Sequence, residues 1–151
     1  MDIKMNKIKK IAISLIVVAM TIIGLSEATT SAANSLTTSV TMNEDFAFGG
    51  TSYIHTSDDS YNVYATFEAA YMCEVYVKFE LQRYTNGSWS TISTKKGGIA
   101  TNSHDYKKNA NVTFENISNS YGASTRVKVT LYADSGYTDS MQTANSKTWT
   151  R

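Results

Sequence analysis

The chain has 151 residues, of which 42% are hydrophobic and 18% charged, and it contains no proline. This length predicts one domain that can bury enough surface to fold without disulfides or metal ions. Its single cysteine excludes an intrachain disulfide framework and a cysteine-cluster zinc site. The balance of 14 Lys and Arg against 13 Asp and Glu lacks the basic footprint of a nucleic-acid-binding protein.

Residues 1–28 have the pattern of a secretory signal peptide. Four lysines precede an uncharged run over residues 11–25, which is shorter than the ~20 apolar residues of a membrane span. Small residues at Ser26 and Ala28 predict cleavage after Ala28, and Ala33 offers an alternative cleavage site. We therefore expect a helical signal peptide and a secreted protein without membrane association after cleavage. Residues 29–151 then carry 10 Lys and Arg against 11 Asp and Glu, and residues 29–39 form a flexible lead-in.

Period-2 alternation of apolar and polar residues predicts strands in the remainder of the chain, residues 40–151. A first, weak strand is predicted from Leu36 to Met42. Apolar residues then occupy the odd positions from 61 to 81, a stretch too long for one ordinary strand, so we expect a break at residues 70–73. A loop is expected over residues 97–108, and further strands over residues 110–117, 126–134 and 142–149. Six to seven strands in one domain predict an all-β, antiparallel β-sandwich.

Asn86 and Gly87 are the clearest turn signal. This dipeptide between alternating runs favours a type I′ hairpin, because both turn residues need a positive φ. The resulting register places Tyr84 opposite Trp89 on the outer face, and Leu81 opposite Ile92 in the core. A cross-strand aromatic pair contributes about 0.2–1 kcal/mol, so Tyr84 and Trp89 are expected to fix this hairpin.

The C-terminal part resembles the last three strands of an immunoglobulin-like or fibronectin type III domain. The shared features are the Val127-x-Val129 alternation, the turn at Asp134 to Gly136 and the Thr-rich final strand. This resemblance implies a sandwich of that family, although Thr125 stands where such domains often have a corner tyrosine. The lone Cys73, the NGSW hairpin and the SKTWT ending are similar to those of short secreted β-proteins of Gram-positive bacteria to which no activity is assigned. That similarity implies an extracellular, non-catalytic protein.

The two histidines offer little support for catalysis. His55 and His104 lie 49 residues apart and match no metalloprotease or nucleophile motif. We interpret them as surface residues, with a site that combines them with Asp58 and Asp59 as the alternative. No catalytic residue, metal site or cofactor is therefore predicted, and the protein is not expected to be an enzyme.

The remaining reactive groups also have plain structural interpretations. Glu68, Glu74 and Glu80 are evenly spaced, which favours solvated strand faces over a pair of glycosidase carboxylates. Cys73 is expected to be a small buried residue, with an intermolecular disulfide or a nucleophile as alternatives. The aspartates at 58–59 and 134–139 match no EF-hand, so turn chemistry is favoured over calcium binding.

The aromatic residues give the best indication of function. All 17 follow residue 28, and strand parity directs five of them away from the core: Tyr64, Tyr76, Tyr84, Trp89 and Tyr132. Outward aromatics either mark interaction sites or pair across strands and shield the backbone. We predict a non-enzymatic binding module that uses Tyr76, Tyr84 and Trp89 on a cell-wall glycan, another glycan or a protein. The alternatives are a secreted toxin, bacteriocin-like factor or inhibitor that acts on another protein through a sheet edge or residues 95–105, and a small hydrolase that uses His55 or His104.

Overall fold

The computed structural model describes residues 35–119 and 122–151, all of which belong to one compact unit. Within these residues the secondary structure consists of ten β-strands. The described residues form no helix that is long and apolar enough to cross a membrane. The signal peptide predicted for residues 1–28, both cleavage sites and the lead-in up to residue 34 lie outside the described residues.

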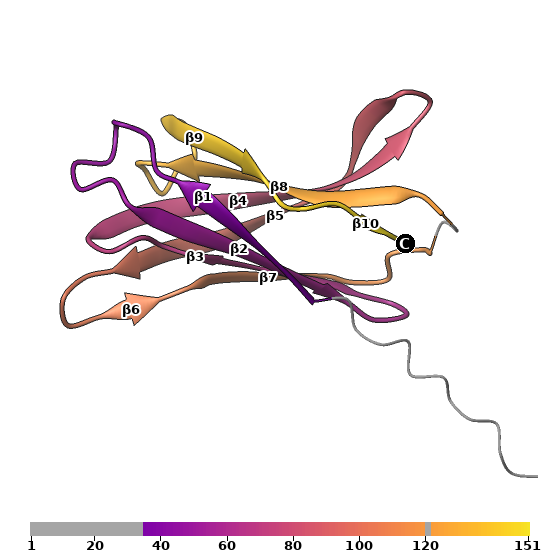
Figure 1. Ribbon diagram of the computed structural model, residues 1–151, viewed down its shortest axis with the longest axis horizontal. Helices are drawn as coiled ribbons and strands as arrows, with labels where there is room; N and C mark the ends of the chain where they lie inside the picture. Colours follow the sequence, from indigo (N-terminus) through magenta and orange to yellow (C-terminus); the bar gives the residue numbers. More distant parts are fainter. Residues whose placement is uncertain (1–34, 120–121) are drawn as a thin grey trace, which may run out of the picture. The chain divides into compact units, whose positions relative to one another are not determined.

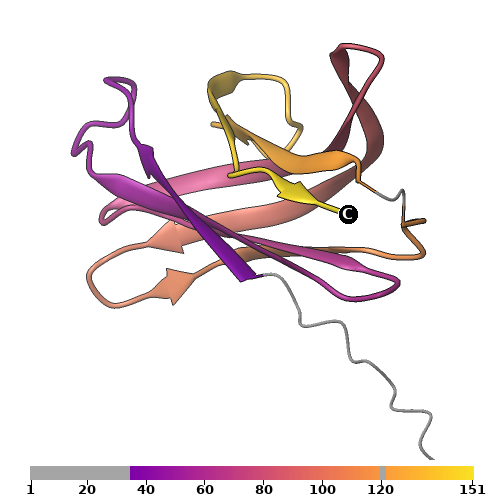
Figure 2. The same ribbon diagram turned by 45° about the vertical axis from the view of Figure 1, so that its right-hand side comes forward.

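The strands form two antiparallel sheets (Figure 1, Figure 2). The four-stranded sheet has the order β1-β2-β3-β7, with β1 Ser35–Thr41, β2 Thr51–Asp58, β3 Val63–Glu68 and β7 Ala110–Phe114. The six-stranded sheet has the order β10-β8-β4-β5-β6, and β9 also pairs with β8. Its strands are β4 Cys73–Thr85, β5 Ser88–Asn102, β6 Lys107–Lys108, β8 Ser124–Tyr132, β9 Ser140–Asn145 and β10 Trp149–Thr150. The predicted all-β architecture of antiparallel sheets is thus confirmed, but the described residues form ten strands instead of the six to seven predicted. The additional strands are β2, the two-residue β6, and the division of the last predicted strand into β9 and β10.

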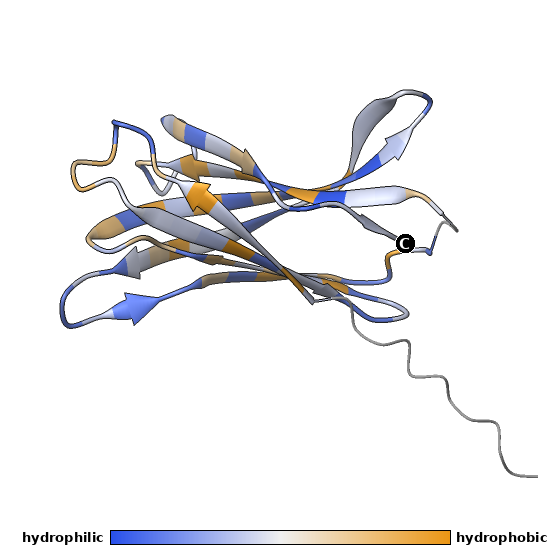
Figure 3. Cartoon of the chain, in the orientation of Figure 1, coloured by the Kyte–Doolittle hydropathy of each residue, from blue (hydrophilic) through white to orange (hydrophobic). Residues whose placement is uncertain are grey.

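A single apolar core joins the two sheets because the inward positions of their strands are apolar. Its largest fully buried side chains come from both sheets and include Phe67, Phe79, Phe114, Ile54, Leu81 and Leu131. The odd-numbered alternation is confirmed within β3 and within β4 up to Leu81, and it breaks as expected between Glu68 and Cys73. It fails at Tyr61 and Tyr71, which lie outside the strands and are exposed. Hydrophilic residues by contrast dominate β6 and the tip of the β4–β5 hairpin (Figure 3).

Strand β2 was not predicted, because three of its four inward residues are polar. Ser52, Thr56 and Asp58 are buried, as Ile54 is, and they alternate with outward residues. Because these inward residues are polar, the sequence does not show the apolar alternation that usually identifies a strand. Strand β1 pairs with β2 along its whole length, from Ser35 to Thr41. The flexible lead-in predicted for residues 29–39 is therefore wrong at residues 35–39, which belong to the sheet. The last strand predicted, over residues 142–149, is divided into β9 and β10, which pair with opposite ends of β8.

The β4–β5 hairpin confirms part of the predicted register. Tyr84 lies opposite Trp89 across a turn in which Asn86 and Gly87 have φ of 51° and 81°. The prediction that Leu81 faces Ile92 was wrong, because a bulge inserts one residue and pairs Leu81 with Ser93 instead. Ile92 is the inserted residue, and its side chain is 42% exposed rather than in the core.

A second bulge replaces the loop that was predicted over residues 97–108. Gly97 is the inserted residue, since Val77 pairs with Gly98 and Lys78 pairs with Lys96, and β5 continues to Asn102. A Cβ atom at Gly97 would lie 2.4 Å from Cε2 of Phe79 and 3.3 Å from Cβ of Ala110. The glycine is therefore required by close packing of the bulge against the core, not by a turn.

We predict that Gly97→Ala destabilises the fold by about 1–3 kcal/mol, because the added methyl group must displace the buried Phe79 ring. Urea unfolding monitored by circular dichroism measures this change. Ser93→Ala, on the same strand, is the matched control and should change the free energy of unfolding by less than about 0.5 kcal/mol. Equal stability of Gly97→Ala and the native protein would show that the bulge has room for a side chain.

Candidate functional site

The outer face of the six-stranded sheet holds all three predicted binding residues. Odd positions of β4 point into the core, so Tyr76 and Tyr84 point outward, and Trp89 joins them from β5. Tyr76 and Tyr84 are eight residues apart on one strand, which corresponds to about 26 Å. The three residues consequently belong to two separate clusters, one at each end of the face.

The hairpin cluster consists of Tyr84, Trp89 and Arg126. The rings of Tyr84 and Trp89 have centroids 5.3 Å apart, which confirms the predicted cross-strand pair. The Arg126 guanidinium, from β8, lies 4.1 Å from the centroid of the Trp89 ring, and its Nε donates to Oε1 of Gln82 at 2.9 Å. One side of the tryptophan is thus covered by a cation, while Tyr84 remains 45% exposed.

The tyrosine cluster consists of Tyr76, Tyr132 and Tyr137. Tyr76 and Tyr132 are paired residues of β4 and β8, and the ring of Tyr137 packs edge-on against both at 6.1 and 5.4 Å. Tyr132 was predicted to be an exposed outward residue, yet it is only 7% exposed because Tyr137 lies over it. Tyr137 comes from the β8–β9 loop and was not among the predicted residues.

Two features hold Tyr137 over the sheet. The Asp134 carboxylate accepts the backbone N–H groups of Thr138 and Asp139 at 2.9 and 2.8 Å, which closes the loop. The Gly98 N–H, next to the inserted bulge residue, donates to Oη of Tyr137 at 3.1 Å. Tyr137 has a φ of 61°, a conformation that a bulky side chain rarely adopts. The Asp-Ser-Gly sequence indicated the turn but not where the following tyrosine would lie.

Two lysines flank the tyrosine cluster. Lys78 of β4 and Lys96 of β5 are directly paired, so both side chains lie on the outer face. The Lys96 ammonium is 4.3 Å from the centroid of the Tyr137 ring, and the Lys78 ammonium is 5.4 Å from that of Tyr132. A hydrogen bond to Tyr132 raises the pKa of Lys78, so this side chain is charged at neutral pH.

The aspartates considered for calcium serve the turns instead. Asp59 accepts the backbone N–H groups of Tyr61 and Asn62 and the hydroxyl of Tyr64, each at 2.7 Å. These bonds, led by that from Tyr64, lower the pKa of Asp59 from 3.8 to about 2. Tyr64 is one of the predicted outward aromatics. It lies on β3 of the four-stranded sheet, so it does not belong to the candidate face. The described residues contain no group of three or more His, Cys, Asp or Glu side chains placed to hold a metal ion.

The structure does not combine the two histidines with Asp58 and Asp59. His55 points outward from β2, whereas Asp58 of the same strand is buried. Asp59 is used within its own turn, and His104 pairs with Asp105 in the exposed turn between β5 and β6. The alternative site drawn from these four residues is therefore absent from the described part of the chain.

His55 instead belongs to a hydrogen-bonded chain on the outer face of the four-stranded sheet. Its Nδ1 lies 3.0 Å from Oγ1 of Thr37, and its Nε2 lies 3.1 Å from Oε2 of Glu68. Alcohol, imidazole and carboxylate in this order could activate a nucleophile. Acyl transfer also needs N–H donors aimed at the oxyanion, but β2 is paired with strands on both sides at this position. We therefore interpret the chain of contacts as a link between strands.

Glu68, Glu74 and Glu80 do not form a glycosidase-like pair. Glu68 belongs to β3 of one sheet, whereas Glu74 and Glu80 point outward from β4 of the other. Glu80 pairs with Lys128 at 3.5 Å, and Glu68 pairs with Lys107 at 2.5 Å. Two of the three carboxylates thus pair with neighbouring cations, and Glu74 is exposed on the outer face.

Cys73 is a buried residue, as predicted. Its side chain is 5% exposed, and burial raises the pKa of its thiol from 9.0 to about 11. Nucleophilic cysteines need a lowered pKa, because the thiolate is the reactive form. Cys73 therefore contributes to the core.

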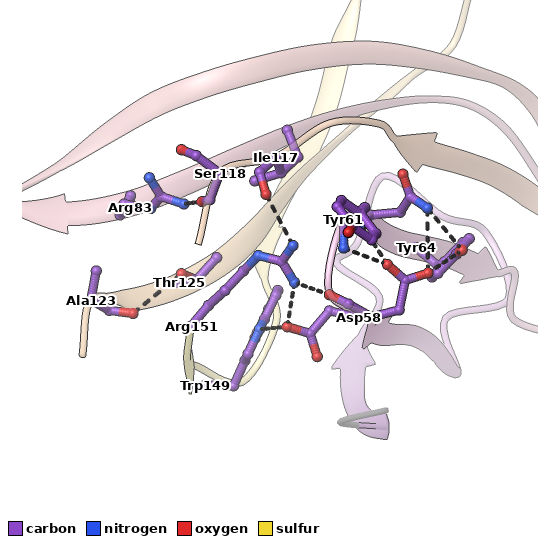
Figure 4. Close-up of polar contacts among 12 residues, drawn as sticks. Asp58, Tyr61, Tyr64, Arg83, Ile117, Ser118, Ala123, Thr125, Trp149 and Arg151 are labelled. Atoms are coloured by element: carbon purple, nitrogen blue, oxygen red, sulfur yellow. Dashed lines mark hydrogen bonds and ion pairs between the residues drawn. The ribbon is translucent and has the colours of Figure 1, made fainter. Parts of the chain in front are cut away.

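A buried ion pair closes the end of the sandwich nearest the last residue (Figure 4). Asp58 accepts from Nη1 of Arg151 at 2.8 Å and from the Trp149 indole at 3.1 Å. Arg151 also donates to the carbonyl oxygens of Asp59 and Ile117 at 2.7 and 3.1 Å. The pair thus fixes the C-terminal strand to the four-stranded sheet and to the segment that precedes β8.

We predict that Arg151→Met destabilises the fold by about 3–5 kcal/mol, because it leaves the buried Asp58 carboxylate without its cation. The double variant Asp58→Leu/Arg151→Met should lose less than Arg151→Met alone, since no buried charge remains unpaired. Lys147→Met, an exposed residue of the same segment, is the control for loss of a positive charge. Thermal and urea unfolding measure the three effects, and equal losses for Arg151→Met and Lys147→Met would contradict the prediction.

We also predict that Lys107→Met raises the pKa of Glu68. The Lys107 ammonium, followed by His55, holds this pKa below its ordinary value of 4.5. An ionised Glu68 therefore stabilises the fold above that value, and the effect is lost as the pH falls through the lowered pKa. Carboxyl-detected NMR titration measures the shift, and Lys108→Met, one residue away, should leave Glu68 unchanged.

No protein-family model, curated protein or solved structure matches this chain. Relatives therefore supply neither a function nor a ligand for the two clusters. Their function has to follow from the residues that form them.

Proposed function

We propose that this chain is a secreted, non-enzymatic binding module whose ligand is a glycan that contacts the outer face of the six-stranded sheet. The signal-peptide pattern of residues 1–28 supports export. The hydrogen bonds of His55, Glu68 and Asp59, and the raised pKa of Cys73, favour binding over catalysis.

The observation that carries this proposal is the composition of the outer face. It combines two aromatic clusters, and each cluster has a cation held against a ring. Tyrosine and tryptophan with arginine are the residue types enriched at interaction sites. Aromatic rings are rigid and carry a polar atom, so they suit the mixed apolar and hydroxyl surface of a sugar.

The strand order supports an immunoglobulin-like or fibronectin type III sandwich for the proposed module. Strands β2, β3 and β7 would correspond to A, B and E, and β4, β8 and the β9–β10 segment to C, F and G. Strand β1 is then an addition beside A. Thr125 stands at the position of the corner tyrosine, and its hydroxyl donates to the carbonyl oxygen of Ala123 at 3.3 Å (Figure 4).

A protein partner is a second candidate, and exposed apolar side chains at one end of the sandwich favour it. Loops β1–β2, β3–β4 and β5–β6 lie together at the end opposite the last residue (Figure 1). They expose 70% of Phe48, 58% of Tyr71, 44% of Met72 and 58% of Tyr106. A secreted effector or inhibitor that acts on another protein would use this end.

We predict that Trp89→Ala weakens retention on insoluble peptidoglycan, chitin or cellulose by about tenfold or more, because a central aromatic contact is lost. Pull-down with each polysaccharide, followed by a binding isotherm on the one retained, measures the effect. Tyr76→Ser tests the other cluster with little change to the hairpin.

Tyr53→Ala is the matched control, because Tyr53 lies on the outer face of the four-stranded sheet and stacks on His55. It should bind as the native protein does. Thermal unfolding of each variant separates loss of binding from loss of fold. Unchanged retention of both Trp89→Ala and Tyr76→Ser would show that the face is not the binding site.

A further inference from the structure

Two lysines occupy an unfavourable arrangement on the outer face. Lys78 and Lys96 are direct cross-strand partners, and like charges in such positions destabilise a sheet. Among the described residues, neither ammonium has a carboxylate oxygen within 4.0 Å. The repulsion between them is therefore not compensated by an ion pair.

Positive charge is concentrated on this face. Residues 29–151 carry 10 Lys and Arg against 11 Asp and Glu, so no overall positive charge attracts anions. The outward ionisable residues of β4, β5 and β8 are four cations against two carboxylates: Lys78, Lys96, Arg126, Lys128, Glu74 and Glu80. Glu80 makes its ion pair with Lys128, and Lys78, Lys96 and Arg126 make no ion pair with a carboxylate of the described residues.

Both lysines lie against tyrosine rings of the tyrosine cluster, and tyrosine is a side chain that suits contact with a sugar. A ring below an ammonium attracts it electrostatically and leaves its hydrogen-bond donors available to a ligand. Tyr137 is held over the sheet at a φ of 61° by the closed β8–β9 loop and the Gly98 N–H. Backbone strain of this kind clusters at binding sites, where the surrounding structure maintains it.

We infer that the ligand of the outer face is an acidic polysaccharide, with a carboxylate, sulfate or phosphate group bound between Lys78 and Lys96. This inference rests on the proposed glycan-binding function and specifies its ligand class. The positive charge of the two lysines favours an anionic group, and the flanking tyrosine rings favour a sugar as the molecule that carries this group. Arg126 lies four residues further along the sheet, about 13 Å away, so a chain molecule can contact both clusters.

Dextran and dextran sulfate test this inference, because they share a backbone and differ in charge. Binding of the purified protein to each is measured by isothermal titration at several salt concentrations. We expect dextran sulfate to bind at least roughly tenfold more tightly than dextran, and its affinity to fall as salt rises. Poly-glutamate, an anionic polymer without sugar rings, should bind more weakly than dextran sulfate.

The variant Lys78→Gln/Lys96→Gln should lose most of the preference for dextran sulfate, because it removes both cations that flank the tyrosine cluster. Thermal unfolding of the variant shows whether the fold is retained. Lys107→Gln/Lys108→Gln removes the same charge from β6 and should keep the preference. Unchanged dextran sulfate binding by the first variant, or equal loss in both, would overturn the inference. So would poly-glutamate that binds as tightly as dextran sulfate.

The outcomes also separate this inference from the proposed function. Binding of neutral polysaccharide that depends on Trp89, without any preference for dextran sulfate, would keep the glycan-binding module and refute the acidic ligand. Failure to bind any polysaccharide, neutral or acidic, would refute the proposed function itself.

Discussion

Two one-residue bulges in β5 determine which residues reach the outer face of the six-stranded sheet. If the register set by the hairpin turn continued unbroken, Lys96 would lie opposite Val77 and point into the core. Burial of an unpaired ammonium there would cost far more than the fold could tolerate. The bulge at Ile92 shifts the pairing by one residue and places Lys96 opposite Lys78, on the solvent side. The bulge at Gly97 shifts it again and places Ala100 opposite Val75, in the core.

The second bulge also connects the fold to the tyrosine cluster. An inserted residue interrupts the ladder of backbone hydrogen bonds, and the N–H of the neighbouring Gly98 donates to the hydroxyl of Tyr137. That bond holds Tyr137 over Tyr132 and Tyr76. Lys96 in turn lies against the ring of Tyr137, and Lys78 lies against that of Tyr132. Gly97 packs closely on the core, which the stability of the fold requires. The same bulge presents the neighbouring Gly98 N–H to Tyr137 and so fixes the geometry of the tyrosine cluster.

The sequence predicts those features that depend on local chemistry. Alternation identified β4 and β8 because their inward positions are apolar, and the Asn-Gly turn placed Tyr84 opposite Trp89. The same reasoning missed β2, whose inward residues are mostly hydroxyl-bearing or acidic. Two of them have partners distant in the sequence, because Ser52 accepts from the Ala70 N–H and Asp58 accepts from Arg151. This reasoning assigned Tyr76, Tyr84 and Trp89 to one face, but it could not show that Tyr137 of a distant loop covers Tyr132. Bulges were equally invisible, because Ile92 carries no local signal and a Gly-Gly pair is also typical of a loop.

Two arrangements of charged residues in this structure are unfavourable by the ordinary rules of stability: a buried ion pair and a cross-strand pair of like charges. The first is explained by contacts within the molecule, whereas the second is the basis of the proposed ligand class. The buried Asp58–Arg151 pair is costly to desolvate, but the Trp149 indole also donates to Asp58, and Arg151 also donates to two backbone carbonyl oxygens. Its charges are satisfied within the molecule, so it needs no ligand to explain it. Lys78 and Lys96 are like charges paired across the sheet beside a tyrosine held at positive φ, and among the described residues neither ammonium has a carboxylate oxygen within 4.0 Å. Local rules broken without an internal compensation are expected at functional sites. The missing compensation is a negative charge, and an acidic polysaccharide supplies it from outside.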